Sequence, residues 1–516
     1  MYRHKHGCSL TELLKQSASR CGDKIALGDA KMQVTYRVLN NRIRCLASAF
    51  IDQGLKRGDR VAFVFPNSVD YVIVHYAVMA AGGVSVPVDN FFTPRNLAYQ
   101  IENTGSQFLL FDRMHWDKVA RTGLDQFDFL ASNGPASGNK PDWAGRVFSL
   151  QDLVCGKEKS LPEIEPDDQA MIIYTTGTTG RQKGVMLTHR NLAVSAMNIM
   201  ERCEVTENDC ELTALPQTRL FGLAHIHGYL ALGARMMLVR NMILPQKVLP
   251  LIEKIGATSF PHVPTAFYTL MDHYPELLRE YGSRLRYILM CSAPLKPERY
   301  RQLKTMLPSV RLFTSYGLTE AARSTIIELD RHPEKLLSVG TPTPGMTIRI
   351  IDGDRIVPTG EEGEVVLDGS IVTPGYWNLP EENHRVFSPH GFRTGDLGKL
   401  DEEGFLYIVG RIKDIINVSG LKVNPLEIEE ELKKFEGLED AAVAGFPDEK
   451  GSLNEKIVAF YVSSDGKDLD EKALRDHCYR QLESFKVPVH FQRINEIPKT
   501  VSGKIQRVKL RESHSF

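Results

Sequence analysis

The chain has 516 residues, of which 42% are hydrophobic and 25% are charged, and its formal net charge is −1. The length exceeds what one hydrophobic core organises, so we expect two or more domains, and the balanced charge favours neither nucleic acid nor an anionic membrane as a partner. Eight scattered cysteines without a C-x-x-C pair indicate neither a zinc site nor a disulfide framework, and they favour a reducing, cytoplasmic setting.

The first residues are basic but lack the apolar core of a secretory signal. The most apolar segment, 72–88, contains a histidine and a Gly-Gly pair and falls short of a membrane-spanning helix. We therefore expect no membrane span.

Helices and strands alternate through the first part of the chain. Ser9 followed by Glu12 predicts a capped helix over 9–15. Further helices are expected at 35–54, 68–81 and 94–103, and strands at 25–36 (as a pair), 60–65, 84–87 and 107–111. The Gly- and Asn-rich stretch 122–141 predicts a loop. This alternation predicts a parallel or mixed sheet with helices on both faces.

A second α/β half follows, and after it the predicted elements become short strands. A helix is expected at 188–200, and strands at 210–215, 235–239, 259–260, 285–291 and 311–315. Short strands at 347–351, 363–367 and 405–409 indicate a small β-rich module. Beyond it, helices at 425–434 and 471–482 and strands at 440–444, 456–462 and 491–494 predict a small α+β domain. The expected domains are 1–410 and 411–516.

The stretch Tyr174–Gly184, YTTGTTGRQKG, follows an apolar run and predicts a buried strand that opens into a polar loop. Its backbone N–H groups, hydroxyls and lysine suit a polyphosphate, and Gly177, Gly180 and Gly184 allow close backbone approach. The loop does not match G-x-x-x-x-G-K-[ST], so it is not a Walker A motif. A Thr/Gly surface turn is the alternative interpretation.

The sequence YTTGTTGRQKGV resembles the phosphate-binding motif of the AMP-forming adenylating enzymes, which include acyl-CoA synthetases, peptide-synthetase adenylation domains and luciferases. That family usually has Pro where this chain has Gln182. Further matching stretches run in family order to Lys504, among them YGLTE, TGD, GRIKD and PKTVSGKIQR. The resemblance implies a large N-terminal domain of two α/β subdomains plus a β-rich module, and a small mobile α+β C-terminal domain.

The resemblance also implies the activity: an acid is adenylated with ATP and Mg²⁺, pyrophosphate leaves, and the acyl group passes to the thiol of coenzyme A. It assigns Thr179, Lys183, Glu320 and Lys504 to catalysis, with Glu320 as the Mg²⁺ ligand. Residues implied to contact the nucleotide are Thr175, Thr176, Gly177, Thr178, Thr179, Gly180, Lys183, Ser292, Ala293, Pro294, Ser315, Tyr316, Gly317, Thr319, Asp396 and Arg411.

Within that set the resemblance gives individual roles. Tyr316 would stack on adenine, Asp396 would accept the ribose hydroxyls, and Lys504 would bridge the acid and the α-phosphate, where its charge offsets the repulsion between two anions. Taken alone, Thr319 would be a helix N-cap, Asp396 a residue of a tight turn, and Lys504 a solvated lysine.

The C-terminal motifs imply a second reaction stage. VSGLKV at 418–423 resembles the loop that lines the pantetheine tunnel, so Gly420 and Lys422 are expected beside coenzyme A. Lys413, in the boundary segment, is the expected pivot. The lack of an insertion around 344–365 favours coenzyme A over an acyl carrier protein. An adenylation enzyme that loads a carrier or forms amides is the alternative.

The substrate loop LPQTRLFG contains no acidic residue, which disfavours an amino acid as substrate. Residues expected at the acid pocket are Arg219, Phe221, His225 and Met290, together with His227, Val263, Ser292, Ala293 and Pro294. Most are small or apolar, which suits a fatty or aromatic monoacid. Arg219 stands where His or an aromatic residue is common. It either pairs with a wall carboxylate or stacks on Phe221, or it faces the pocket and selects an acid with a distal anion.

Overall fold

The computed structural model describes residues 7–123, 127–134, 147–155, 159–175, 182–291, 295–418, 421–447, 455–499 and 505–514. The chain forms two compact units, one of Met1–Thr347 with Leu367–Phe392 and one of Ile348–Val366 with Arg393–Phe516. A division into compact units does not test which part of the chain turns, so the boundary between residues 410 and 411 stays a prediction.

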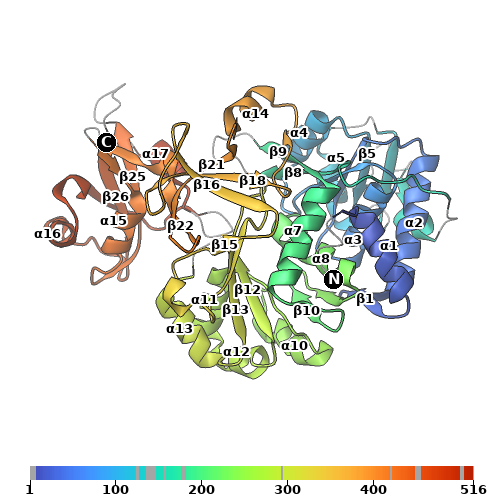
Figure 1. Ribbon diagram of the computed structural model, residues 1–516, viewed down its shortest axis with the longest axis horizontal. Coiled ribbons are helices and arrows are strands. Elements are labelled where there is room, and N and C mark those ends of the chain that lie inside the picture. Colours follow the sequence, from blue (N-terminus) through green and yellow to red (C-terminus); the bar gives the residue numbers. More distant parts are fainter. Residues whose placement is uncertain are drawn as a thin grey trace. The chain divides into compact units, whose positions relative to one another are not determined.

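The first unit contains an eight-stranded sheet in the order β19-β9-β8-β4-β3-β5-β6-β7 (Figure 1). Its strands are β3 Arg60–Val64, β4 Val84–Pro87, β5 Phe108–Phe111, β6 Phe129–Ser132, β7 Val147–Ser149, β8 Gln169–Thr175, β9 Lys183–Thr188 and β19 Gly375–Tyr376. The six strands from β8 to β7 run parallel, and β9 is antiparallel to both of its neighbours, β8 and β19. The parallel strands are almost wholly apolar because helices cover both faces of such a sheet.

Strand β6 corrects the prediction of a loop over 122–141. Its four residues lie within polar, glycine-containing sequence that offers no alternation to detect. It forms because Phe129 and its neighbours pair in parallel with β5, which buries all four residues of β6.

A second sheet is built from two four-stranded parts, ordered β10-β11-β1-β2 and β12-β13-β14-β15. These strands are β1 Ile25–Gly28, β2 Gln33–Thr35, β10 Cys210–Thr213, β11 Arg235–Leu238, β12 Tyr287–Cys291, β13 Arg311–Tyr316, β14 Thr325–Glu328 and β15 Thr341–Pro342. Ser259 bridges Glu211 in β10 and Tyr287 in β12, so it joins the two parts. The strand pair near the N-terminus therefore belongs to the second sheet.

The five helices of the first unit that were predicted with bounds start where the sequence predicts. The N-cap hydroxyls of Ser9, Thr35, Ser68, Thr93 and Thr188 each accept a backbone N–H bond. The helices are α1 Leu10–Arg20, α2 Tyr36–Asp52, α3 Val69–Ala80, α4 Pro94–Thr104, α5 Trp116–Ala120, α6 Leu150–Val154, α7 His189–Arg202, α8 Leu220–Leu232, α9 Pro245–Val248, α10 Pro250–Ile255, α11 Pro264–His273, α12 Pro275–Gly282, α13 Pro297–Met306 and α14 Pro380–Val386. Helix α1 extends beyond the predicted residue 15.

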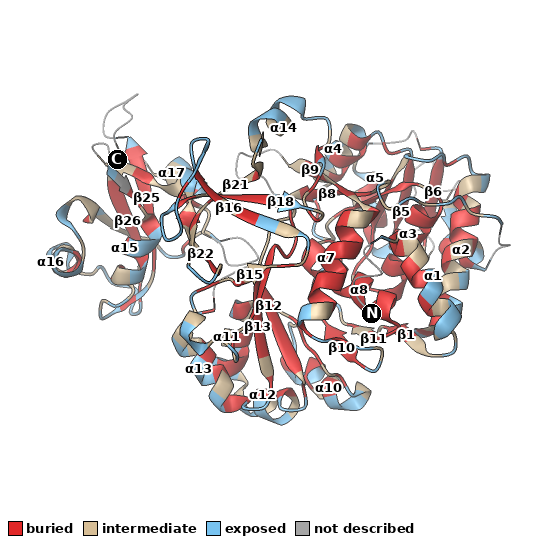
Figure 2. Cartoon of the chain, in the orientation of Figure 1, coloured by how far each residue is buried: buried red, intermediate tan, exposed pale blue. Residues whose placement is uncertain are grey.

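Helices α3 and α8 are buried along their whole length, as expected for helices that are apolar all round. They meet at two histidines, where Nε2 of His75 lies 3.1 Å from Nε2 of His227. Helix α7 contacts β9 of the first sheet and also α8, and α8 contacts β11 of the second sheet. Helices α7 and α8 therefore lie between the two sheets (Figure 1). Figure 2 shows α8 and the strands of both sheets as the buried core. No helix among the described residues is long and apolar enough to cross a membrane.

The second unit is the small α+β part that the sequence predicts, extended by strands of the β-rich module. Its elements are β17 Arg355–Ile356, β22 Leu406–Arg411, β23 Ile416–Val418, β24 Leu421–Val423, α15 Pro425–Leu432, β25 Leu438–Pro447, β26 Glu455–Ser463, α16 Glu471–Gln481, β27 His490–Arg493 and α17 Arg507–Ser513. The sheet β17-β16-β18-β21-β20 adds β16 Met346–Asp352, β18 Gly363–Gly369, β20 Phe387–Ser388 and β21 Gly391–Leu400. The division into units falls within β16, β18 and β21.

Candidate active site

The predicted phosphate loop connects two antiparallel strands. Strand β8 is buried up to Tyr174, and Thr175 pairs with Lys183 at the start of β9. The predicted buried strand before the loop is confirmed, whereas β9 was not predicted. The predicted loop residues Thr176, Gly177, Thr178, Thr179 and Gly180 lie outside the described residues.

Lys183 has an acidic partner from far along the chain. Its Nζ lies 2.5 Å from Oε1 of Glu382 in α14, and Arg385 reaches the same oxygen at 2.7 Å. Burial raises the pKa of the Glu382 carboxyl, but the hydrogen bonds from Arg385 and Lys183 outweigh it, so the pKa is lowered. Lys183 Nζ also lies 5.2 Å from the centre of the Tyr376 ring.

Tyr376 connects this lysine to the predicted Mg²⁺ ligand. Its hydroxyl donates a 2.6 Å hydrogen bond to Oε1 of Glu320. Burial, and next the charge of Glu320, raise the pKa of Tyr376 well above its usual range, so the phenol remains a donor. Strand β19 brings Tyr376 here by pairing with Val185 of β9.

The carboxylate of Glu320 fits a Mg²⁺ ligand. One oxygen is oriented by Tyr376 and the second is not used in that bond, and Mg²⁺ commonly takes one or two carboxylates together with phosphate oxygens. No group of three or more His, Cys, Asp or Glu side chains suited to a metal occurs in the described part of the chain. Any metal held at Glu320 would therefore complete its coordination with substrate and water oxygens.

The predicted adenine-side residues lie at the end of strand β13 and directly after it. Ser315, which is buried, and Tyr316, which is half-buried, are the last two residues of β13, while Gly317 and Thr319 are half-buried in the connection to β14. Gly317 is required by a close approach, because a Cβ there would lie 2.4 Å from the backbone nitrogen of Arg323. No helix follows Thr319, so the N-cap interpretation is wrong: the chain turns directly into the antiparallel strand β14.

Three further first-unit predictions lie within buried elements. Met290 is buried in β12, and Phe221 and His225 occupy successive turns of α8. Nδ1 of His225 lies 2.8 Å from Oε2 of Glu211, and both side chains are fully buried. The predicted residues Ser292, Ala293 and Pro294 lie outside the described residues.

Arg219 has a carboxylate partner. Its Nη2 lies 2.8 Å from Oδ2 of Asp89, and both side chains are partly exposed. This contact matches the wall-carboxylate alternative for Arg219, and its role toward the acid stays a prediction. The arginine that stacks on the ring of Phe221 is Arg323 and not Arg219, with the guanidinium carbon of Arg323 4.4 Å from the ring centre.

In the second unit, Asp396 and Arg411 form a pair. Nε of Arg411 lies 2.5 Å from Oδ1 of Asp396, and the two residues are direct partners in the β21–β22 ladder. Asp396 is therefore a strand residue, which corrects the tight-turn alternative. The strand was missed at this position because a glycine before an aspartate is typical of turns. In the structure Gly395 lies within β21 and has a φ of +68°.

The predicted pivot Lys413 lies in a short 3₁₀ segment, Ile412–Asp414, directly after β22. Arg507 of α17 lies 3.3 Å from Asp414 and 2.6 Å from Glu429, which ties the boundary segment to the small unit. Lys422 is in β24, but its side chain, together with Gly420 and Lys504, lies outside the described residues.

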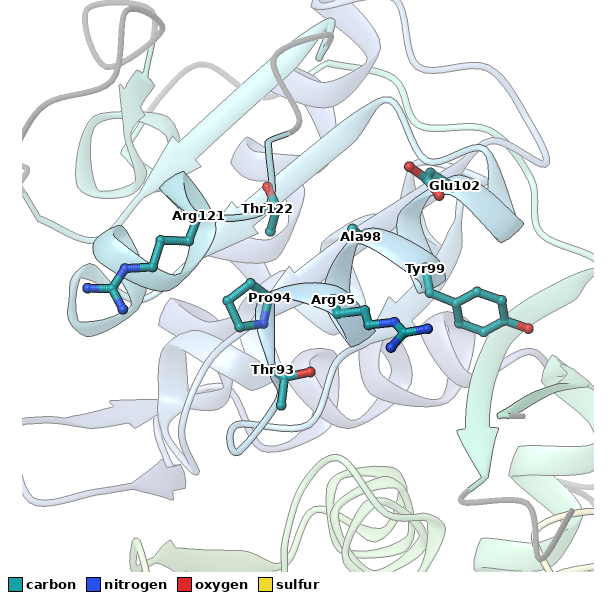
Figure 3. Close-up of a pocket in the computed structure, with 8 residues that line it drawn as sticks. All are labelled: Thr93, Pro94, Arg95, Ala98, Tyr99, Glu102, Arg121 and Thr122. Atoms are coloured by element: carbon teal, nitrogen blue, oxygen red, sulfur yellow. The ribbon is translucent and has the colours of Figure 1, made fainter. Parts of the chain in front are cut away.

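A surface hollow of about 710 Å³ lies beside α4 and contains none of the predicted site residues (Figure 3). Its lining is Thr93, Pro94, Arg95, Ala98, Tyr99, Glu102, Arg121 and Thr122. Helix α4 is hydrogen-bonded to Gln182, the residue before β9. The Gln182 carbonyl accepts from the Tyr99 hydroxyl at 3.1 Å, and its Oε1 accepts from Nε2 of Gln100 at 2.7 Å. Gln182 is thereby held to α4. The lining of the hollow includes neither Lys183 nor Glu320, the two predicted site residues that both contact Tyr376.

Three residues of this site were not found from the sequence: Glu382, Tyr376 and Arg323. Tyr376 and Glu382 lie about 200 positions after Lys183, and only the pairing of β19 with β9 brings them near. The signal for Arg323 was visible, because an arginine interrupts the apolar run Ala321-Ala322 before a strand of small and β-branched residues.

The chain is similar to known proteins over nearly its whole length. The family model "AMP-binding enzyme" matches residues 14–377, and "AMP-binding enzyme C-terminal domain" matches 427–504. The chain is 31% identical to an oxalate–CoA ligase of Arabidopsis thaliana, with 97% of each chain covered. It is also 31% identical to a long-chain-fatty-acid–CoA ligase of Bacillus subtilis, over 98% of this chain and 95% of that one.

The fold is similar to that of ATP-bound MatB from Rhodopseudomonas palustris, with a TM-score of 0.86, 29% identity, and 98% of this chain and 99% of that one covered. The family-model match extends over more than half of the sequence and includes the β8–β9 hairpin, Glu320 and Tyr376. The chain therefore belongs to the AMP-binding enzyme family.

Proposed function

We propose that this chain is an AMP-forming acid–thiol ligase. It activates a carboxylic acid with ATP, releases pyrophosphate, and transfers the acyl group to the thiol of coenzyme A. The observation that carries the proposal is the arrangement around Tyr376, where the ring approaches Lys183 and the hydroxyl holds Glu320. A cation for phosphate and an oriented carboxylate for Mg²⁺ are what phosphoryl chemistry on ATP requires.

The chain's own residues have separable tasks in this reaction. Lys183 exchanges Glu382 for a phosphate oxygen when ATP binds, so the carboxylate competes with the phosphate for the ammonium. Glu320 would hold Mg²⁺, which when bound neutralises charge on the leaving pyrophosphate. Asp396 would accept the ribose hydroxyls while Arg411 orients its carboxylate. Lys504 would stabilise the charge that develops as the acid attacks phosphorus.

The relatives do not select the acid. Two proteins at the same 31% identity are named for oxalate and for long-chain fatty acids, so similarity supports the reaction and leaves the acid open. The prediction of a fatty or aromatic monoacid rests on small and apolar wall residues and does not account for the buried Arg323. Coenzyme A as acceptor, rather than a carrier protein, is supported by the names of these relatives.

A two-part assay tests the proposal. Incubation with ATP, Mg²⁺ and a panel of acids should give acid-dependent AMP and pyrophosphate, and addition of coenzyme A should give the acyl thioester by mass spectrometry. Formation of ADP and phosphate would contradict the adenylation chemistry. Pyrophosphate exchange without any thioester would instead favour a carrier-loading or amide-forming enzyme.

A further inference from the structure

Arg323 is a buried cation for which the described residues provide no carboxylate. The residue is 4% exposed, and neither Nε nor Nη2 has a hydrogen-bond partner among the described residues. Burial lowers the pKa of the guanidinium, yet an arginine stays protonated in proteins. An unpaired buried charge costs several kcal/mol, so its persistence calls for a partner that arrives with a ligand.

The backbone holds Arg323 in a strained conformation. Its φ is +60°, in the left-handed region that a long side chain rarely adopts. Two contacts maintain it: the carbonyl accepts the Thr343 hydroxyl at 2.9 Å, and the backbone nitrogen packs against Gly317. Such strain persists where the surroundings determine the conformation, and it is frequent at ligand-binding positions.

The side chain lies against the predicted acid pocket. Its guanidinium stacks on Phe221, in the first turn of α8, and the ring of Phe221 contacts that of His225 at 5.4 Å. Cys291, at the end of β12, is close enough to influence the guanidinium electrostatically. All four residues belong to the first unit. Stacking fixes the plane of the guanidinium and leaves its edge to bind.

Arg219 provides an internal comparison. It is the arginine that the sequence singled out, but it is partly exposed and already paired with Asp89. Arg323 is the reverse, because it is buried and lacks a carboxylate among the described residues. A guanidinium that selects a substrate anion needs an unoccupied edge and a place from which water is largely excluded. Arg323 is buried, and no described residue accepts a hydrogen bond from its Nε or Nη2.

Resting on the proposed ligase function, we infer that Arg323 is a specificity-determining residue and that the acid carries a second, distal carboxylate. Nε and Nη2 lie on one edge of the guanidinium and present two parallel N–H groups, which match the two oxygens of a carboxylate. The other carboxylate of the same acid is the one that is adenylated. The substrate class is therefore a dicarboxylic acid rather than a fatty or aromatic monoacid.

The test compares linear dicarboxylic acids of several chain lengths with their monomethyl esters, which keep the reacting carboxylate and remove the distal charge. We expect kcat/KM for pyrophosphate release to favour the diacid by about 10²-fold or more at the best length, because a site built around a polar contact rejects an analogue that lacks it. Arg323→Met should lose this preference while keeping activity on the half-ester. Arg323→Lys should be intermediate, because an ammonium lacks the fork.

Control variants and melting temperatures distinguish a loss of specificity from a loss of folding. Arg299→Met removes a guanidinium that is paired with the Asp272 carboxylate and is not among the predicted pocket residues, so the diacid-to-ester ratio should stay as in the wild type. Arg323→Met should melt at the same temperature as the wild type or higher, because it removes an unpaired buried charge. The best diacid should raise the melting temperature of the wild type and leave that of Arg323→Met unchanged.

The outcomes separate the two proposals. If diacid and half-ester react equally in the wild type, or if Arg323→Met loses both equally, the inference is overturned and the ligase function stands. The second result would mean that the guanidinium serves a phosphate of the nucleotide. If no acid releases pyrophosphate, the ligase function fails, and the melting shift with the diacid then decides on Arg323 alone.

Discussion

The phenol of Tyr376 donates a 2.6 Å hydrogen bond to Oε1 of Glu320. This bond joins a residue that pairs with the phosphate-loop hairpin to the carboxylate expected to hold Mg²⁺. The same ring lies 5.2 Å from Nζ of Lys183, so one aromatic side chain positions groups of opposite charge. Neither contact is visible from the motifs in which Lys183 and Glu320 occur.

Tyr376→Phe should reduce adenylation by roughly 10-fold and raise the Mg²⁺ concentration needed for half-maximal rate. The ring and its packing remain, but Glu320 loses the donor that orients it, a loss of about 1.5–3 kcal/mol for a hydrogen bond to a charged group. ATP–pyrophosphate exchange measured against Mg²⁺ checks this. Tyr300→Phe is the control, because the Tyr300 hydroxyl donates at 3.1 Å to a different carboxylate, that of Asp330. Equal effects in both variants would contradict a role in orienting Glu320.

Lys183→Met should lower the rate of adenylate formation by about 10²–10³-fold, the usual cost of removing one preorganised charge. Glu382→Gln should instead improve ATP binding and lower KM for ATP a few-fold, because the Glu382 carboxylate competes with phosphate for the ammonium of Lys183. Initial rates of pyrophosphate release against ATP measure both. A higher KM in Glu382→Gln would show that the pair positions Lys183 rather than competing for it.

Lys504→Ala and Gly420→Trp should divide the two half-reactions. Lys504→Ala should lose about 10²–10³-fold in adenylate formation while still converting supplied acyl-adenylate to thioester. Gly420→Trp should exchange pyrophosphate normally and fail to form thioester, because an indole fills the space expected for the thiol-bearing arm. Lys413→Pro should resemble Gly420→Trp if the chain turns at this residue. Loss of both half-reactions in Gly420→Trp and Lys413→Pro, with folding intact by circular dichroism, would contradict alternation.

Stability should fall with acid below pH 6.5, in part through His75. Burial lowers the pKa of folded His75 from 6.5 to about 3, so the unfolded chain binds a proton in this window that the folded chain does not. The contribution is complete above pH 6.5 and is lost progressively toward pH 3, with a slope of about 1.4 kcal/mol per pH unit for one proton. His75→Asn should flatten the decline in urea-unfolding free energy between pH 6.5 and 5. The exposed His273→Asn should leave it unchanged, and an unchanged slope in His75→Asn would contradict this assignment.

Local features of this protein follow from the sequence itself. The cap at Ser9 was predicted, and Thr35, Ser68 and Thr188, which also cap helices, are the first residues of predicted helices, because a hydroxyl cap needs only a backbone N–H three residues away. Strand β8 was predictable from its apolar run. The motifs and their order likewise indicate the family and the reaction, because each motif is a short continuous stretch of the chain.

Tertiary structure decided what depends on partners far apart in the chain. It assigned β1 and β2 to the second sheet, formed β6 and β9 by pairing, and placed Asp396 in a strand opposite Arg411. It gave Lys183 and Glu320 their neighbours, and it distinguished Arg219, which pairs with Asp89, from Arg323, which has no carboxylate partner in the described part of the chain. The physical reason is that pairing, burial and the charge that an arginine faces depend on long-range contacts, whereas a cap or an apolar run is decided within one turn of chain.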